Sequence, residues 1–323
     1  MGKLVLIDGN AILHRAYHAL PKTLTSKSGE PINALYGFVS MLLRIIQDLK
    51  PTHIAVCFDR KEPTFRHKQF PDYQAQRPKM DEELSSQFDK TKQVIKSFGI
   101  PIYEKAGYEA DDLLGSIAKQ ATSQWSLVSS KRKKKTRVQR LESRTQIDEV
   151  VIVTGDRDIL QLVEDKVKVY LPIKGLSESQ LLGEDEVIKK MGVKPDQIDD
   201  YKALVGDQSD NYPGVLGIGP KTTISLLSKF KSKQGIYKNL AKIDSSIRDK
   251  LEKGRESADI SYELAKIVTD VDIKPDWEEM DDWSVGEQET LDLFSEIGFK
   301  TLAKRIIDIG KKIESEKQGS LFK

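Results

Sequence analysis

Apolar and polar stretches alternate along the first part of the chain in a way that predicts strands and helices in turn. Apolar runs with the length of buried strands occur at 3–8, 53–59, 149–156 and 166–171. Apolar residues at helical spacing lie between and beyond these runs, at 33–49, 84–98, 109–121 and 157–163. Strands that alternate with helices favour a mostly parallel sheet with helices on both faces. We therefore expect an α/β domain over about 1–185.

The pattern changes after about residue 185. Strand candidates cease there, and helical patterns follow one another at 184–191, 195–205, 220–230, 243–252, 257–268 and 287–312. We expect a helical subdomain over 186–312 and a mobile tail over 313–323, where charged and small residues replace the pattern. Two polar segments interrupt the α/β pattern, one from residue 60 and a basic one over about 122–148.

Composition narrows the class of protein. The apolar start is too short, and too soon broken by Asp8, to span a membrane, and it lacks the layout of a secretory signal. The one cysteine, Cys57, lies in an apolar run, so we expect neither a disulfide nor a cysteine metal site. These features fit a cytoplasmic protein. Because the net charge is only +2, binding to a polyanion would need segregated charge.

Carboxylates stand at the ends of the predicted strands and at the start of a predicted helix. Acids in the first turn of a helix can be a solvated cap that the helix dipole favours. Acids at several parallel strand ends are different, because those ends meet at one edge of the sheet, where sites form. We therefore expect one cluster that comprises Asp8, Asp59, Glu109, Asp111, Asp112, Asp156, Asp158, Asp207 and Asp210.

The makeup of this cluster indicates its chemistry. Carboxylates without histidine or cysteine partners suit hard cations such as Mg²⁺ or Mn²⁺. Seven or more acids in one place predict two such ions, which would also relieve the repulsion between the carboxylates. Two ions are the usual apparatus for in-line displacement at a phosphodiester.

A second motif lies at 214–230. Closely spaced glycines let the backbone approach a ligand, and Pro220 suits the first position of a helix. Free N–H groups at such a helix start bind phosphate, and a lysine adds charge. We expect a helix-hairpin-helix that contacts DNA backbone, although an ordinary connection between two helices would also fit. The residues concerned are Gly214, Gly217, Gly219, Lys221 and Thr222.

Five stretches together resemble the 5′ nuclease domain of the bacterial DNA polymerase I family, which is related to the flap endonucleases. They are LIDGNAILHRAYHAL, FDRKEPTFRHKQFPDYQAQRP, GYEADDLLGSIA, VTGDRDILQLV and YKALVGDQSDNYPGVLGIGPKT, in the family's order over about 1–300. The resemblance implies a PIN-like 5′ nuclease core with a helical arch at about 60–97. It implies a monomeric, nucleoid-associated enzyme that removes 5′ flaps and RNA primers in replication and repair, leaving a 5′-phosphate and a 3′-hydroxyl.

The resemblance also implies roles for individual residues. Asp8, Asp59, Glu109 and Asp111 would hold the first metal ion, and Asp156, Asp158 and Asp210 the second. Asp112 and Asp207 would act mostly through water. Arg66 and Arg77 would steer the scissile phosphate, and a K⁺ ion could bind at the hairpin. Contacts with DNA would involve Arg15, Tyr17, Tyr73 and Gln74, of which the tyrosines either stack on bases or belong to ordinary packing.

The chain departs from the family pattern in three places. Gln74 stands where the arch usually carries a lysine, in a Tyr-Lys-x-x-Arg pattern that here reads YQAQR. Residues 122–148 have no family counterpart and are read as a flexible loop far from the metals. The chain also stops where the polymerase would continue, so it is either a free-standing nuclease or a fragment.

The last residues resemble the peptide by which bacterial replication proteins bind the sliding clamp. Gln318, Ser320, Leu321 and Phe322 match that peptide, and Gly319 replaces the usual leucine. The alternative is that the apolar pair packs back on the nuclease.

Two rival functions predict different motifs. A small PIN-type ribonuclease would need neither arch nor hairpin, and a non-catalytic flap-binding protein would lose acids. The complete set of motifs favours the nuclease.

Overall fold

The computed structural model describes residues 2–129, 147–174 and 178–321. A six-stranded sheet with strand order β3-β2-β1-β4-β5-β6 forms the centre. The first five strands in chain order are parallel, and only β6 runs antiparallel to its neighbour β5. The strands are β1 (Gly2–Asp8), β2 (His53–Cys57), β3 (Ile102–Tyr103), β4 (Ile147–Val153), β5 (Val167–Lys174) and β6 (Glu178–Leu182).

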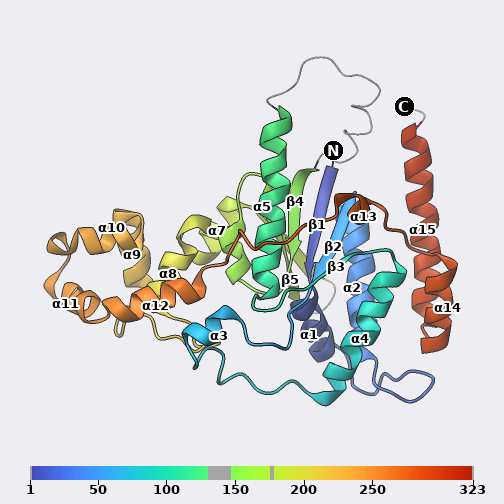
Figure 1. Cartoon of the computed structure of the whole chain (residues 1–323), viewed down its shortest axis with the longest axis horizontal. Coiled ribbons are helices and arrows are strands. Elements are labelled where there is room, and N and C mark those ends of the chain that lie inside the picture. The colour runs from blue at the N-terminus through green and yellow to red at the C-terminus, as the bar shows by residue number, and fades with distance from the viewer. Residues whose placement is uncertain (1, 130–146, 175–177, 322–323) are drawn as a thin grey trace.

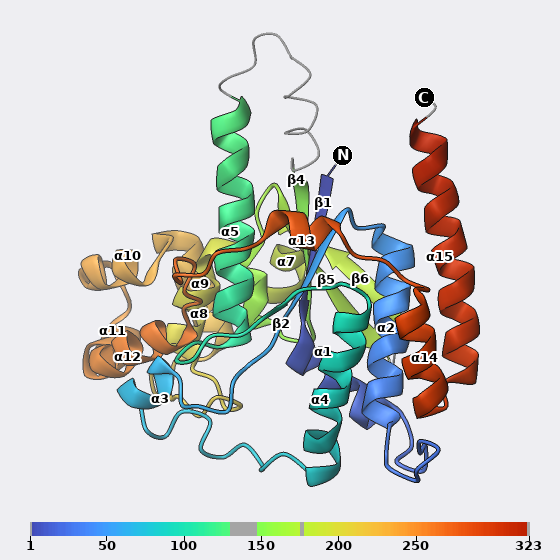
Figure 2. The same ribbon diagram turned by 45° about the vertical axis from the view of Figure 1, so that its right-hand side comes forward.

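Helices cover both faces of the sheet, as expected for parallel strands that are buried on each side (Figures 1 and 2). Leu4 and Leu6 of β1 belong to the core that contains α5 (Ala110–Ser129). Val5 and Ile7 belong to the opposite core, and this alternation is the two-residue period of a strand. The opposite core is built with α1 (Gly9–Ala19), α2 (Asn33–Leu49), α4 (Glu82–Ser97), α14 (Gln288–Ile297) and α15 (Lys300–Leu321).

A group of shorter helices lies beside the α/β part, on the left in Figure 1. After α12 the chain runs back past α5 to α13 (Trp277–Asp281), which contacts β2. The boundaries predicted at 185 and 312 stay predictions, but the structure packs α14 and α15 against α4 and α2 of the α/β part rather than with these helices. The group consists of α7 (Glu184–Met191), α8 (Ile198–Val205), α9 (Pro220–Phe230), α10 (Lys233–Lys238), α11 (Ser245–Lys253) and α12 (Arg255–Ala265).

Several elements differ from the sequence expectations. The short strand β3, the edge strand β6 and helix α1 were not predicted, because their apolar patterns are too short. The helix expected over 287–312 is two helices, since Gly298 ends α14 with a φ of 99°. The tail expected to be mobile continues α15 as far as Leu321.

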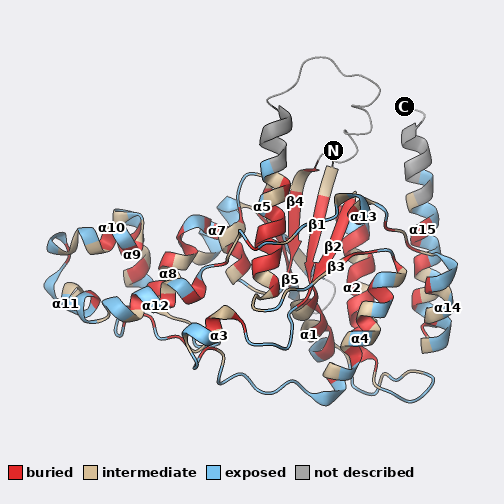
Figure 3. Cartoon of the chain, in the orientation of Figure 1, coloured by how far each residue is buried: buried red, intermediate tan, exposed pale blue. Residues whose placement is uncertain are grey.

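The expected helical arch is only partly helical. It contains the short α3 (Phe65–Gln69) and the longer α4, and residues 70–81 between them form turns without a helix. Those residues are mostly exposed, whereas buried positions gather on the strands and on the facing sides of α5 and α2 (Figure 3). Within the described part of the chain, no helix is both long and apolar enough to cross a membrane.

Candidate active site

Asp8 lies where β1 passes directly into α1. Its Oδ1 atom accepts the Ala11 N–H at 2.9 Å and so caps the helix. Its Oδ2 atom accepts the Thr154 hydroxyl at 2.7 Å, which ties β1 to the end of β4. Burial of this carboxyl raises its pKa to about 7, although both hydrogen bonds favour the ionised form. A cation close to this carboxyl would stabilise its ionised form.

The next carboxylates join the end of β2 to the start of α5. Asp59 accepts the Ala110 N–H at 2.6 Å, and its own N–H donates to Asn10 Oδ1 at 3.0 Å. Burial, followed by repulsion from Asp59 and other nearby acids, raises the pKa of Glu109 to about 7. The pKa of Asp111 is raised well above its usual value, first by burial and then by repulsion from Asp156, Asp8 and Asp59. The predicted convergence at one sheet edge is therefore present.

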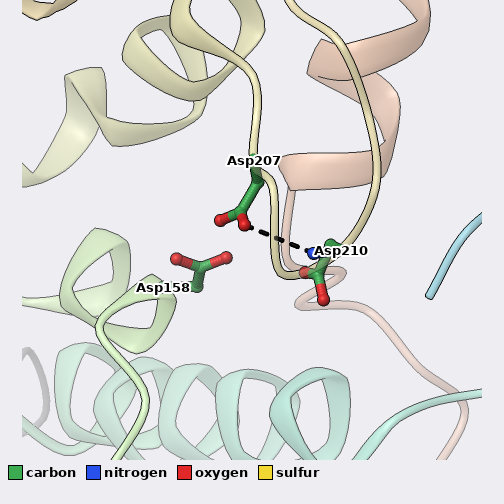
Figure 4. A group of neighbouring side chains, drawn as sticks. All are labelled: Asp158, Asp207 and Asp210. Atoms are coloured by element: carbon green, nitrogen blue, oxygen red, sulfur yellow. Dashed lines mark hydrogen bonds between the residues drawn. The ribbon is translucent and has the colours of Figure 1, made fainter. Parts of the chain in front are cut away.

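A second group of acids combines a 3₁₀ helix of the α/β part with a loop that follows α8. Asp158, Asp207 and Asp210 each offer an oxygen, and these atoms lie within 4.8 Å of one another (Figure 4). Asp156 Oδ1 accepts the Asp158 N–H at 2.8 Å. Since Asp156 also repels Asp111, it lies between the two groups. The first group, Asp8, Asp59, Glu109 and Asp111, is less compact: among the described residues, no three of these acids bring one oxygen each within 4.8 Å of one another.

Acids of both groups, with the exception of Asp207, line one cavity. Its volume is about 1080 Å³, and its wall also includes the arch residues Tyr73, Gln74 and Arg77. An acid-lined space of this size, open to the arch, can accommodate cations together with a phosphodiester. The acids in the wall are Asp8, Asp59, Glu62, Asp89, Glu104, Glu109, Asp111, Asp156, Asp158 and Asp210, and seven of these belong to the predicted cluster.

Asp207 does not line the cavity but lies behind it, in the turn that carries Asp210. Its Oδ1 atom accepts the Ser209 N–H at 2.7 Å and the Asp210 N–H at 3.3 Å, so it organises the turn that carries Asp210. The Oδ2 atom accepts a hydrogen bond from Lys202. Lys202 also forms an ion pair with Asp158, and the sequence analysis did not single it out, because no local pattern marks that contact.

Arg66 and Asp112 form a buried pair at the wall of the cavity, where Arg66 Nη1 also lies 3.5 Å from Glu109 Oε2. The guanidinium of Arg66, a residue only 2% exposed, makes two parallel hydrogen bonds of 2.8 Å to Asp112 and two more to the carbonyl oxygens of Leu264 and Lys266. Asp112 also accepts the Val268 N–H. These contacts join α3, α5 and the segment after α12. The phosphate contact expected for Arg66 and the water-mediated metal contact expected for Asp112 stay predictions.

The arch contacts the second group of acids through Asp210. Arg77 Nη2 lies 2.5 Å from Asp210 Oδ1, and about half of the Arg77 side chain is exposed. Gln74 adopts a left-handed backbone with φ 57°, and its Nε2 donates to the same oxygen at 3.3 Å. Both residues are thus beside the acids, as the sequence predicted for a phosphate-facing segment.

The two tyrosines expected at DNA are buried, each with 3% exposure. The Tyr17 hydroxyl donates to Asp81 at 2.7 Å, which ties α1 to the residue before α4. The Tyr73 hydroxyl lies 3.3 Å from Glu109 Oε2 and 3.4 Å from Asp210 Oδ2. This burial fits the alternative of ordinary packing, and base stacking by either ring stays a prediction.

Comparison with known proteins decides the family. The N-terminal resolvase-like domain of 5′-3′ exonucleases matches residues 3–134, and their C-terminal SAM fold matches residues 193–290. The chain belongs to the 5′-3′ exonuclease family. This confirms both the predicted resemblance and the predicted class of enzyme.

Relatives of this 5′-3′ exonuclease family member include both long and short proteins. It is 39% identical to DNA polymerase I of Caldicellulosiruptor bescii over 94% of the chain and 33% of that protein. It is 35% identical to DNA polymerase I of Bacillus subtilis over 94% of the chain and 32% of that protein. The chain thus spans about a third of these relatives. A 5′-3′ exonuclease of Aquifex aeolicus is 36% identical, with all of both chains covered.

Solved structures share the fold. A flap endonuclease of bacteriophage T5 with DNA and metal ions is similar with a TM-score of 0.62 and 20% identity, over 97% of this chain and 99% of that one. The catalytic core of Rad2 with DNA is similar with a TM-score of 0.56 and 15% identity, over 95% and 92% of the two chains. The predicted α/β fold with its helical subdomain is therefore confirmed.

At the start of the hairpin, the backbone at Gly214 packs directly against the backbone at Gly206. Gly214 has a φ of 63°, and a Cβ atom there would lie 2.3 Å from the Gly206 nitrogen. Its N–H donates to Ser261 Oγ, and its carbonyl accepts from Ser257, so α12 supports the hairpin. Leu216, between Gly214 and Gly217, is 93% exposed. Gly219 caps α9, where Lys221 is exposed and Thr222 is half-buried.

The remaining predicted residues lie at the margins of the site. Arg15 lines a second cavity of about 530 Å³ with His18, Gly155 and Asp156. In the tail, Gln318, Ser320 and Leu321 belong to α15, and Phe322 lies outside the described residues. Most of the basic segment 122–148 also lies outside them. Its flanks, the end of α5 and the start of β4, stand at the sheet edge opposite the acids (Figure 1).

Proposed function

We propose that this chain is a structure-specific 5′ nuclease that cuts phosphodiesters at 5′ flaps and 5′ ends of DNA, and in RNA primers, with the help of two divalent metal ions. The observation that carries the proposal is the single cavity lined by acids from the ends of three parallel strands, the start of α5 and the loop after α8. The products would carry a 5′-phosphate and a 3′-hydroxyl.

The residues fit Mg²⁺ or Mn²⁺. Carboxylates from both groups line the cavity. Burial, with repulsion between neighbouring acids, raises the pKa values of Asp8, Glu109 and Asp158 to about 7, so cations would favour their ionised forms. Asp8, Asp59, Glu109 and Asp111 would hold one ion, and Asp156, Asp158 and Asp210 the other. Such ions supply an activated water and stabilise charge at the phosphate.

Side chains of the protein would bind and orient the substrate. Arg77 faces the cavity with part of its guanidinium free to contact a phosphate, and Gln74 offers a neutral hydrogen-bond donor beside it. The hairpin would bind the backbone of the duplex through N–H groups at the start of α9 and the charge of Lys221. A K⁺ ion at the hairpin carbonyls would support that contact.

The experiment is digestion of a double-flap DNA labelled at its 5′ end. We expect one cut near the base of the flap in Mg²⁺ and none in EDTA, with a product that a DNA ligase can seal without prior phosphorylation. Matching digestion of single-stranded and fully duplex DNA of the same sequence would contradict structure-specific recognition.

The tail supports a separate proposal, that Gln318, Ser320, Leu321 and Phe322 bind the bacterial sliding clamp. Titration of the clamp with the full chain and with a chain that lacks 318–323 tests it. We expect micromolar-class binding by the full chain only. Equal binding by both chains would contradict the proposal.

A further inference from the structure

Lys202 is the only lysine in the described residues that forms ion pairs with two carboxylates of the second group of acids. Its Nζ atom lies 2.6 Å from Asp158 Oδ1 and also contacts Asp207 Oδ2. The side chain is 13% exposed, and the two carboxylate side chains are 15% and 14% exposed. Because water and salt reach this triple poorly, its charges interact more strongly than those of a surface pair.

The backbone fixes Lys202 relative to both acids. It lies in the last turn of α8, and its carbonyl oxygen accepts the Gly206 N–H at 2.8 Å, which ends the helix. Asp207 and Tyr212 then exchange two backbone hydrogen bonds that close the loop carrying Asp210. The ammonium thus joins this loop to Asp158 in the α/β part.

The charges in the second group are only partly balanced. Asp158, Asp207 and Asp210 carry three negative charges when ionised, and the positive charges in contact with them are Lys202 and Arg77. Arg77 belongs to the arch and is half-exposed, so its ion pair with Asp210 is weaker than the buried ion pairs of Lys202. Burial alone would lower the pKa of Lys202, but Asp158 and Asp207 outweigh it, so the ammonium stays charged.

We propose that Lys202 is a positioning residue and a fixed counter-ion, which holds Asp158 and Asp207 in place and lowers the affinity of the second group of acids for a divalent ion. This inference rests on the proposed function, because it assumes that the second group binds such an ion. A cation fixed next to Asp158 repels a divalent ion that uses the same carboxylate, and it occupies one of its two oxygens.

The proposal distinguishes Lys202 from a lysine that only stabilises the fold. Loss of a structural lysine would disorder the loop and weaken metal binding. Loss of a counter-ion strengthens metal binding, because the same acids then carry one more uncompensated negative charge. The direction of the change in affinity therefore decides between the two roles.

The test is titration of Mn²⁺ into wild-type and Lys202→Met protein, followed by electron paramagnetic resonance of the free ion. We expect the weaker of two Mn²⁺ dissociation constants to fall about tenfold in Lys202→Met. The thermal midpoint in EDTA should fall and recover with Mn²⁺. Lys202→Arg, which keeps the charge, should keep the wild-type dissociation constants.

Lys233→Met is the matched control. Lys233 is another buried lysine of the helical group, 2.8 Å from Asp259 and away from the cavity. Its loss should lower stability without changing the Mn²⁺ constants. Unchanged or weaker Mn²⁺ binding by folded Lys202→Met would overturn the proposal. A wild-type protein that binds no Mn²⁺ would instead overturn the proposed function, and this inference with it.

Discussion

At the scale of single residues, two arginines from the same segment have opposite roles. Arg66 is buried on Asp112, so Arg66→Met leaves a buried carboxylate without its partner and should cost about 3–5 kcal/mol of unfolding free energy. Arg77→Met removes an exposed charge and should cost less than about 1 kcal/mol, while single-turnover cleavage falls. Urea unfolding followed by circular dichroism measures the first effect. Equal stability losses in the two variants would contradict this distinction.

The raised pKa values of the buried acids predict how stability depends on pH when no metal is bound. Glu109 has a pKa of about 7 in the folded protein, against roughly 4.3 when unfolded, so the folded state holds its proton between these values. Stability from this group is present below about pH 4 and is lost as pH rises to 7. In EDTA we expect Glu109 alone to lower the unfolding free energy by on the order of 2–3 kcal/mol from pH 5 to pH 8, and Asp8 and Asp158 to act in the same direction.

Unfolding in urea at both pH values measures this change. Saturating Mg²⁺ should restore the stability at pH 8, because bound cations favour the ionised acids. Glu109→Gln should make the pH dependence in EDTA shallower, and the raised pKa values of Asp8 and Asp158 should leave part of it in place. A protein that is more stable in EDTA at pH 8 than at pH 5 would contradict the assignment.

Gln74 predicts a gain of function by a single change. Its side chain already reaches Asp210, and its left-handed backbone is as accessible to lysine as to glutamine. A lysine there would add positive charge where the phosphate gains negative charge in the transition state. We expect Gln74→Lys to raise the single-turnover rate in saturating Mg²⁺. A rate that is unchanged or lower would indicate that another cation already fills this role.

At the scale of elements, the hairpin depends on one glycine and tolerates change at another. A Cβ atom at Gly214 would collide with the backbone of Val205 and Gly206, whereas a Cβ atom at Gly219 meets no atom within 4 Å. Gly214→Ala should therefore destabilise the helical group by a few kcal/mol and weaken DNA binding. Gly219→Ala should fold normally. Thermal unfolding and fluorescence anisotropy with duplex DNA measure both, and equal behaviour of the two variants would contradict the geometry.

The sequence predicted helices and strands correctly where the apolar pattern was long, and it predicted the acid cluster where motifs lay at strand ends. Helices α2 and α9 follow the predicted ranges 33–49 and 220–230 because each has a full apolar stripe. The length of α15 was missed, since its last turns carry charged and small residues. The pairing of Arg66 with Asp112, Leu264 and Lys266 was also missed, because contacts between residues so far apart leave no local pattern.

At the scale of the whole molecule, the acids come from both of its parts. Asp8, Asp59, Glu109, Asp111 and Asp156 belong to the α/β part, and Asp210 comes from the loop that leads into the hairpin. In the proposed function, contact between a DNA duplex and the hairpin would be linked through this loop to the position of Asp210, one of the carboxylates proposed to hold a metal ion. Such a link would let the shape of the DNA determine where it is cut.

The most direct test of the central claim is single-turnover cleavage of a double-flap DNA by Asp156→Ala and Asp210→Ala, with binding measured on the same substrate. Both variants should lose at least about a thousandfold in rate while they still bind the flap. Asp165→Ala, a change of an exposed acid before β5, should cut at the wild-type rate. If Asp156→Ala or Asp210→Ala cuts at the wild-type rate in saturating Mg²⁺, the two-metal account is contradicted.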